Sequence, residues 1–149
     1  MNNQIRIVPE KNEDRIYEVF EELSDAFYRK DVDKKQLAKK LSRFGAFQIG
    51  FYDAAVAGFV GYYMNDSLSK VAFLSTIVVS PGFHRRGIGT FLLYHCLREC
   101  KNSGMLICRL EVEKSNLDAI RFYKKLGFLF EREATELSDY YFCKLSNIQ

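Results

Sequence analysis

The chain has 149 residues, 48% of them hydrophobic and 28% charged, and this length supports one substantial core but divides poorly into two. Its 22 basic and 19 acidic side chains are mixed along the sequence and leave a formal net charge of +3. This falls well short of the basic stripe typical of a nucleic-acid-binding protein, so we expect a single domain over residues 1–149 and no nucleic-acid partner.

The N-terminal part predicts one short strand and two helices. Ile5–Val8 alternates like a strand, and Pro9 ends it. Apolar residues at three- and four-residue spacing, with acidic residues crowded at the start, predict a helix from about Asp14 to Arg29. A second, shorter helix is expected near Asp33–Leu41.

The hydrophobic period then changes to two, which is typical of strands. The aromatic-rich runs Phe47–Tyr52 and Val56–Met64 predict an antiparallel hairpin. A third run, Val71–Val79, completes a meander of strands and stops at a Ser-Pro-Gly turn.

The C-terminal half alternates helices and strands. A helical pattern after Gly89 is followed by a strand, Ile107–Val112, and by a second helix that Gly127 closes in the C-cap position. Phe128–Glu133 and Tyr140–Leu145 are predicted to form a closing pair of strands. The whole order predicts an α/β fold, with a mixed, mostly antiparallel central sheet of about seven strands and helices on both faces.

The segment Val78–Thr90 runs from a strand through a loop into the start of a helix. Such a junction binds anions, because free backbone N–H groups converge there and the helix dipole adds about half a positive charge. Gly87 and Gly89 would let the oxygens of a diphosphate approach the main chain. The side chains that add charge or a hydroxyl are Arg85, Arg86 and Thr90. A tight turn into a buried helix would also use two glycines.

Two other phosphate-binding motifs do not fit this segment. A dinucleotide fingerprint would need a third glycine where Leu92 stands, and the sequence has no Gly-Lys-Ser/Thr for a P-loop. Both alternatives are therefore set aside.

His84-Arg85-Arg86-Gly87-Ile88-Gly89 and residues 116–128, Asn-Leu-Asp-Ala-Ile-Arg-Phe-Tyr-Lys-Lys-Leu-Gly-Phe, form two motifs in order along the chain. They resemble the acetyl-CoA motif Gln/Arg-x-x-Gly-x-Gly/Ala and the second signature Asn-x-x-Ala-x-x-x-Tyr-x-x-x-Gly-Phe of the GNAT N-acetyltransferase superfamily. The resemblance covers Val71–Phe128 closely and the rest only as element order. His84 departs from the usual Gln or Arg, and weakened or retuned cofactor binding is the most that we expect from it.

The resemblance implies a GNAT-like fold and an acetyl-CoA-dependent N-acetyltransferase, which moves an acetyl group to a primary amine by direct attack in a ternary complex without a metal. Ile77 and Val79 would pair with the pantetheine arm, and the main-chain amides from Arg85 to Thr90 would hold the pyrophosphate. Asn116 would contact the cofactor from the other side, although an ordinary helix N-cap also explains it. The positions assigned to the cofactor are Ile77, Val78, Val79, Arg85, Arg86, Gly87, Ile88, Gly89, Thr90, Asn116, Ala119 and Tyr123.

Acetyl transfer to an amine is helped by a base and an acid. A primary alkylamine has a pKa near 10.4, so only about one molecule in two thousand is neutral at pH 7. The leaving thiolate, with a pKa near 8.5, is helped by a proton donor. For this acid we select Tyr123, which matches the tyrosine of the second signature. A tyrosine beside Phe122 on an amphipathic helix is also explained as a core residue.

For the base we select Glu111, which alternation places opposite Leu110 and Val112 in a strand expected to be covered on both faces. Leu110–Asn116, with Tyr123 twelve residues after Glu111, is similar to the ribosomal-protein N-terminal alanine acetyltransferases of the superfamily. In those enzymes the matching Glu and Tyr serve as base and acid. If Glu111 is only a polar strand residue, water could relay the proton.

No motif identifies the acceptor. We expect first a small-molecule amine, such as an amino sugar, a polyamine or an amino acid, and second a protein N-terminus because of the match around Glu111 and Tyr123. A non-catalytic acyl-CoA-binding domain is the alternative of a different class. An exposed strand edge expected at Tyr140–Leu145 is consistent with a homodimer.

Cysteine spacing and hydropathy set the remaining expectations. The four cysteines, Cys96, Cys100, Cys108 and Cys143, lack the spacing of a zinc site and are expected to be reduced core thiols. With only His84 and His95 as histidines, we expect no metal site. The longest nearly uncharged apolar stretch, Ala54–Met64, is about half as long as a transmembrane helix, and Met1–Glu10 lacks the pattern of a signal peptide. We therefore predict a cytoplasmic protein without a membrane span.

Overall fold

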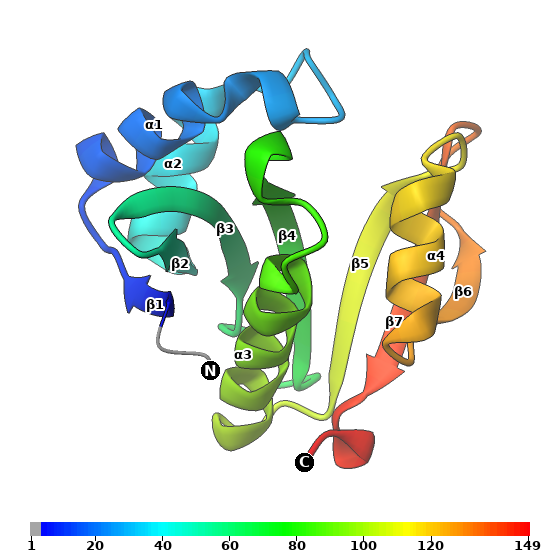
Figure 1. Ribbon diagram of the computed structural model, residues 1–149. Coiled ribbons are helices and arrows are strands. Elements are labelled where there is room, and N and C mark those ends of the chain that lie inside the picture. The colour runs from blue at the N-terminus through cyan, green and yellow to red at the C-terminus, as the bar shows by residue number, and fades with distance from the viewer. Residues whose placement is uncertain (1–3) are drawn as a thin grey trace.

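The computed structural model describes residues 4–149, which build one seven-stranded sheet in the order β1-β2-β3-β4-β5-β7-β6 (Figure 1). Every neighbouring pair is antiparallel except β4 and β5, which are parallel. The strands are β1 (Ile5–Pro9), β2 (Ala46–Tyr52), β3 (Ala55–Tyr63), β4 (Val71–Val79), β5 (Ile107–Glu113), β6 (Leu129–Glu133) and β7 (Ser138–Lys144). The helices are α1 (Glu13–Glu22), α2 (Lys34–Phe44), α3 (Ile88–Asn102) and α4 (Leu117–Lys125). This architecture confirms the predicted α/β fold with its mixed, mostly antiparallel sheet.

The first helix is shorter than its sequence pattern. α1 ends at Glu22, a 3-10 turn covers Ser24–Ala26, and the backbone of Phe27 is extended. The prediction of a helix as far as Arg29 was therefore wrong at its C-terminal end. Ser24 and Asp25 favour a turn over a helix interior, and the ring of Phe27 packs edge-on against Phe20 with centroids 5.6 Å apart. Residues 27–33 instead form a loop, which we name the 27–33 loop.

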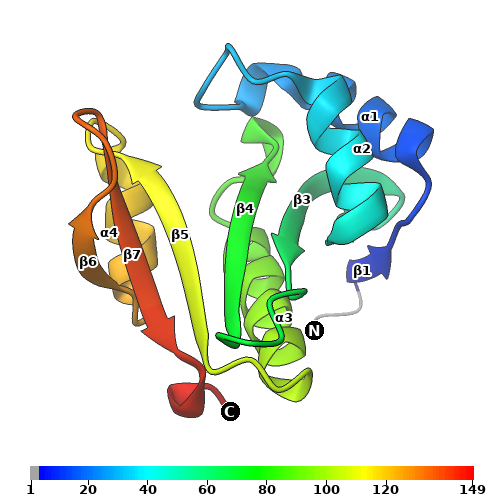
Figure 2. The same cartoon turned by 180° about the vertical axis from the view of Figure 1, so that it is seen from behind.

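Helices pack on both faces of the sheet but cover different parts of it (Figures 1 and 2). α1 and α2 lie on one face and enclose an aromatic cluster with β2 and β3, formed by Phe20, Phe27, Phe47 and Phe59. α3 and α4 lie on the opposite face. Within the part of the chain that the structure describes, no helix covers the face of β5 and β7 that points away from α4 (Figure 2).

β7 lies inside the sheet, between β5 and β6. The expectation of an exposed strand edge at Tyr140–Leu145 was therefore wrong, because the chain places β6 outside β7 and returns β7 to pair with β5. The strand that was expected to favour a homodimer is paired on both sides.

β4 and β5 pair over only a short stretch. Their register runs from Val71 opposite Ile107 to Leu74 opposite Leu110, and beyond it the two strands diverge (Figures 1 and 2). At this diverging end β4 leads toward the start of α3, and β5 leads toward the start of α4. One side of each strand is thereby left without a strand neighbour, close to the N-termini of two helices.

The four cysteines are buried free thiols, as predicted: Cys96, Cys100, Cys108 and Cys143. Among residues 4–149, histidine, cysteine and acidic side chains form no group of three or more that could hold a metal ion. The same residues contain no helix that is both long and apolar enough to cross a membrane.

Candidate active site

The loop between β4 and α3 has a backbone suited to an anion. Arg85 and Gly87 both have positive φ values, 67° and 76°. α3 begins directly after Gly87, and no side chain caps it. The first N–H groups of α3 are therefore left for a ligand at the positive end of the helix dipole. We name residues His84–Thr90 the phosphate loop.

The two glycines of the phosphate loop are suited to it for different reasons. A Cβ added to Gly87 would meet no described atom within 4 Å, so the residue is required for its left-handed backbone. A Cβ added to Gly89 would lie 3.4 Å from the side chains of Phe122 and Val79, which is an ordinary contact distance. At Gly87 the left-handed backbone is thus a second reason for glycine, beside the room that it would leave for a diphosphate.

Two of the three basic side chains at the start of the phosphate loop, His84 and Arg86, contact different partners. Nε2 of His84 lies 3.2 Å from the carbonyl oxygen of Val79, so this nitrogen carries a proton and donates it. His84 thereby joins the loop to the last residue of β4. The guanidinium carbon of Arg86 lies 5.0 Å from the ring centroid of Tyr52 and 5.9 Å from that of Phe83. Arg86 stacks on these rings rather than lining the cavity described next.

A cavity of about 510 Å³ lies between the phosphate loop, the end of β4 and the start of α4, and we name it the loop cavity. The residues lining it that the sequence assigned to the cofactor are Ile77, Val79, Arg85, Gly87, Ile88, Gly89, Thr90, Ala119 and Tyr123. The sequence did not single out three further lining residues, Phe83, Asp118 and Phe122.

A second cavity, of about 340 Å³, lies between the diverging strands β4 and β5, and we name it the strand cavity. Residues of the 27–33 loop, of β4, of β5 and of α4 line it. Val78 and Asn116, both assigned to the cofactor, line this cavity rather than the loop cavity. The two cavities share Ile77, Ala119 and Tyr123 and therefore adjoin at these residues.

Tyr123 stands at the wall that the two cavities share. It is 9% exposed, and its ring packs against Phe122 and Phe128 with centroids 5.5 and 5.7 Å away. Burial raises the pKa of its phenol above the ordinary value, so the hydroxyl keeps its proton near neutral pH. Tyr123 is therefore a core residue that also lines both cavities.

Glu111 lines the strand cavity, but its side chain is exposed. The prediction of a strand covered on both faces was wrong here, because α4 lies only over the face that buries Leu110 and Val112 (Figure 2). The Glu111 carboxylate accepts a hydrogen bond from the hydroxyl of Ser138 at 2.6 Å. The structure thus brings Glu111 and Tyr123 to the same cavity from two consecutive elements, β5 and α4.

Asn116 caps α4, as the simpler of its two explanations required. Its side-chain oxygen accepts a hydrogen bond from the N–H of Ala119 at 3.3 Å. Because Asn116 also lines the strand cavity, capping and contact with a ligand are compatible.

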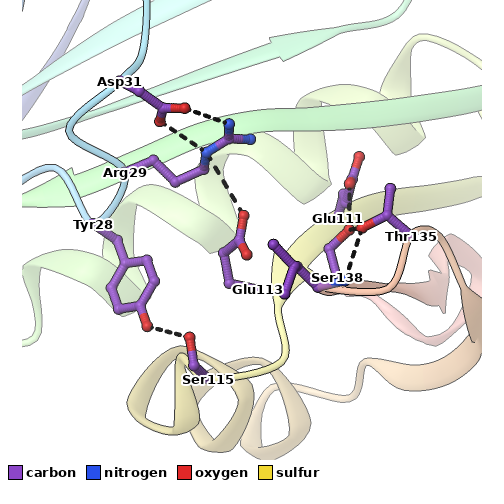
Figure 3. A network of polar contacts seen from close by, with 9 residues as sticks. Tyr28, Arg29, Asp31, Glu111, Glu113, Ser115, Thr135 and Ser138 are labelled. Atoms are coloured by element: carbon purple, nitrogen blue, oxygen red, sulfur yellow. Dashed lines mark hydrogen bonds and ion pairs between the residues drawn. The ribbon is translucent and has the colours of Figure 1, made fainter.

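Two polar contacts that the sequence did not reveal bridge the strand cavity (Figure 3). The hydroxyl oxygens of Tyr28 and Ser115 lie 2.6 Å apart and join the 27–33 loop to the turn before α4. Arg29 pairs with Asp31 at 3.1 Å and with Glu113 of β5 at 3.6 Å. No motif marks Tyr28, Arg29 or Asp31, and the first two fall in a segment that was predicted to be helical.

Comparison with known proteins assigns the family. Residues 13–128 match the model of the acetyltransferase (GNAT) family. The chain belongs to the GNAT acetyltransferase family. The predicted resemblance is thereby confirmed.

Individual relatives of this GNAT protein agree with the assignment. A ribosomal protein bS18-alanine N-acetyltransferase of Salmonella typhimurium is 44% identical over 70 residues, which are 47% of this chain and 45% of that protein. The match therefore spans less than half of the relative. The paia N-acetyltransferase of Thermoplasma acidophilum, in complex with coenzyme A, has the same fold, with a TM-score of 0.76 at 22% identity over 93% of this chain and 99% of that one. The Escherichia coli ribosomal-protein-S18-alanine N-acetyltransferase has a TM-score of 0.75 at 21% identity, covering 94% of each chain.

Gly87→Ala should weaken acetyl-CoA binding without unfolding the protein. Alanine in the left-handed region costs about 1–2 kcal/mol, and relaxation of that strain would turn the following N–H groups away from the ligand. At about 100 times Kd, acetyl-CoA should stabilise the unmodified protein by roughly 2.7 kcal/mol. We expect the corresponding rise in melting temperature to shrink in the variant, measured with and without ligand.

Gly82→Ala is the matched control for Gly87→Ala. Its added Cβ also meets no described atom within 4 Å, but Gly82 has no positive φ. It should keep the full acetyl-CoA shift. Equal losses in the two variants would contradict a conformational role for Gly87.

Proposed function

We propose that this acetyltransferase moves the acetyl group of acetyl-CoA to the α-amino group of a polypeptide. The observation that carries the proposal is the position of Tyr123 at the wall shared by the two cavities, with Glu111 lining the strand cavity. A thioester held in the loop cavity and an amine held in the strand cavity would meet beside Tyr123. The local match to a bS18-alanine N-acetyltransferase supports the choice of acceptor.

The loop cavity has the groups that acetyl-CoA needs. The uncapped N–H groups at the start of α3 suit its pyrophosphate. Residues 75–79 of β4 extend beyond the pairing with β5 and offer backbone groups to the amides of the pantetheine arm. When bound, acetyl-CoA supplies the acetyl group and a thiolate leaving group. Ile77, Val79 and the amides from Arg85 to Thr90 would hold it.

Glu111 and Tyr123 each handle one proton. The Glu111 carboxylate accepts a proton from the ammonium form of the acceptor, and the neutral nitrogen then bonds to the acetyl carbon and loses its second proton to solvent. As the carbon–sulfur bond breaks, the Tyr123 hydroxyl gives its proton to the sulfur. The buried phenol, whose pKa is raised by burial, suits the acid role because it stays protonated near neutral pH.

The exposure of Glu111 favours an α-amine as the acceptor. An α-amino group has a pKa near 8, so about one molecule in ten is already neutral at pH 7, against about one in two thousand for an alkylamine. The demand on the base is correspondingly smaller. An exposed carboxylate therefore suits an α-amine, which needs little help to lose its proton, better than it suits an alkylamine.

A small-molecule amine is the second candidate acceptor. The strand cavity has a volume of only about 340 Å³, and the Tyr28–Ser115 contact spans it from the 27–33 loop. A compact cationic amine would fit beside the carboxylates of Glu111 and Glu113.

Acceptor competition tests the proposal. Release of the coenzyme A thiol would be measured with a short peptide bearing a free α-amine, with the same peptide blocked at its N-terminus and carrying one lysine, and with a polyamine. We expect the free α-amine peptide to react about tenfold faster or more at pH 7. Faster turnover of the polyamine would favour the second candidate, and equal rates for both peptides would contradict α-amine selection.

A further inference from the structure

Glu111 has to be held in place if it is to act as a base. An exposed glutamate side chain samples several rotamers, whereas proton transfer needs a fixed distance to the amine. The structure provides a partner: Oε2 of Glu111 accepts a hydrogen bond from Oγ of Ser138 at 2.6 Å. Ser138 is only 3% exposed, so this partner is itself fixed by packing.

We propose that Ser138 and Thr135 are positioning residues for Glu111. Together they form a hydrogen-bond chain that runs from the turn between β6 and β7 to the carboxylate (Figure 3). The chain holds one carboxylate oxygen and leaves the other, Oε1, for the proton of the amine. This inference rests on the proposed role of Glu111 as the base.

The groups at the two ends of the hydrogen-bond chain determine which way its protons point. The N–H of Leu137 can only donate, and it lies 3.1 Å from Oγ1 of Thr135. A carboxylate that acts as a base can only accept, so the Ser138 hydroxyl donates to Glu111. The Thr135 hydroxyl must then donate to Ser138, with the two oxygens 2.8 Å apart. Each hydroxyl accepts one bond and donates one, and every proton points toward Glu111.

The turn between β6 and β7 is closed by its backbone and does not depend on the Ser138 hydroxyl. The N–H groups of Ala134 and Thr135 donate to the carbonyl of Ser138 at 2.9 and 3.1 Å. The N–H of Lys114 donates to the carbonyl of Leu137 at 2.8 Å. Removal of the hydroxyl alone should therefore release the Glu111 side chain and leave the turn folded.

A double-mutant cycle tests the inference on the full chain. kcat would be measured for the unmodified protein, for Ser138→Ala, for Glu111→Gln and for the double variant. We expect Ser138→Ala to lower kcat about tenfold in the unmodified background, which is typical of a hydrogen bond to a charged group. In the Glu111→Gln background the same change should cost less than about twofold, because the base is already absent. The shift in melting temperature caused by acetyl-CoA should be the same in all four proteins.

Failure of the inference and failure of the proposed function give different results. Equal losses from Ser138→Ala in both backgrounds would overturn the positioning role while leaving Glu111 as the base. An unchanged kcat for Glu111→Gln alone would overturn the base assignment itself, and the positioning role with it.

A second pair of variants tests Thr135, the outer member of the hydrogen-bond chain. It also provides a test if Ser138→Ala does not fold. Thr135 is exposed, so Thr135→Val should be tolerated, and it removes the donor while keeping the shape. We expect a loss of about threefold in kcat, typical of a neutral hydrogen bond. Thr135→Ser should restore the activity, because it restores the hydroxyl. Unmodified activity in Thr135→Val would overturn the role of Thr135.

Discussion

Replacing Tyr123 with phenylalanine should lower kcat by about 100-fold or more, while the affinity for acetyl-CoA changes by less than about twofold. The ring stays, so its packing against Phe122 and Phe128 is preserved. Only the hydroxyl at the wall shared by the two cavities is lost, and the thiolate then leaves without its proton. Thiol release under saturating substrate gives kcat, and the melting temperature with and without acetyl-CoA reports binding. Because burial raises the pKa of Tyr123, the unmodified protein should lose no activity through ionisation of this phenol below about pH 10.

Tyr141→Phe is the matched control for the loss of a buried tyrosine hydroxyl. Tyr141 is 5% exposed and belongs to the same core cluster, but it lines neither the loop cavity nor the strand cavity. Its variant should keep the activity of the unmodified protein. Equal losses of kcat and of acetyl-CoA affinity in Tyr123→Phe would show that the hydroxyl holds the cofactor instead of giving up a proton.

The residues that line the loop cavity could be predicted as a group because they are close together in the sequence. The phosphate loop supplies its amides, its glycines and the start of α3 from residues 84–90, so one local motif describes the whole unit. Asn116, which caps α4, likewise lies in one short segment with Ala119 and Tyr123 of that helix. Nearly all the residues that the sequence assigned to the cofactor do line one of the two cavities.

The polar contacts around the strand cavity could not be predicted, because they join segments that are distant in the sequence. Tyr28 meets Ser115 and Arg29 meets Glu113 only because a loop crosses from the α1–α2 side of the sheet to β5. Helical spacing of apolar residues continues through Phe27, so the pattern alone cannot show that the helix ends at Glu22. The packing of Phe27 against Phe20 and Phe59 in the aromatic cluster instead determines where the backbone runs after α1.

The sequence pattern was also insufficient in the sheet, because it did not reveal that Glu111 is exposed. Alternation correctly placed Glu111 opposite Leu110 and Val112, but it cannot say whether a helix covers the second face. That depends on α4 packing on one side while the other side stays uncovered. The error matters for the proposed mechanism, since an exposed carboxylate must be held in place by a hydrogen bond rather than by burial.

Glu111→Gln should lower kcat/KM by about 100-fold at pH 7 with a peptide acceptor. Glutamine keeps the size of the side chain, and its amide oxygen can still accept from Ser138, so the change removes the proton acceptor and little else. Glu133→Gln is the control, because Glu133 pairs with Lys114 and lines neither cavity. It removes one negative charge from the same sheet and should leave kcat/KM unchanged. Similar losses in both variants would attribute the effect to charge rather than to a base.

The size of the loss in Glu111→Gln should depend on pH in a way that separates the two acceptor classes. An α-amine with a pKa near 8 is mostly neutral at about pH 9, so it needs less help from a base, and the loss should shrink to less than about tenfold. A polyamine with a pKa near 10.4 is still only about one part in twenty-five neutral at that pH, so its loss should persist. The measurement is the ratio of kcat/KM between the unmodified protein and Glu111→Gln at both pH values, for each acceptor. A ratio that stays constant with the peptide would contradict the base role, because the carboxylate would then be doing something independent of the proton on the amine.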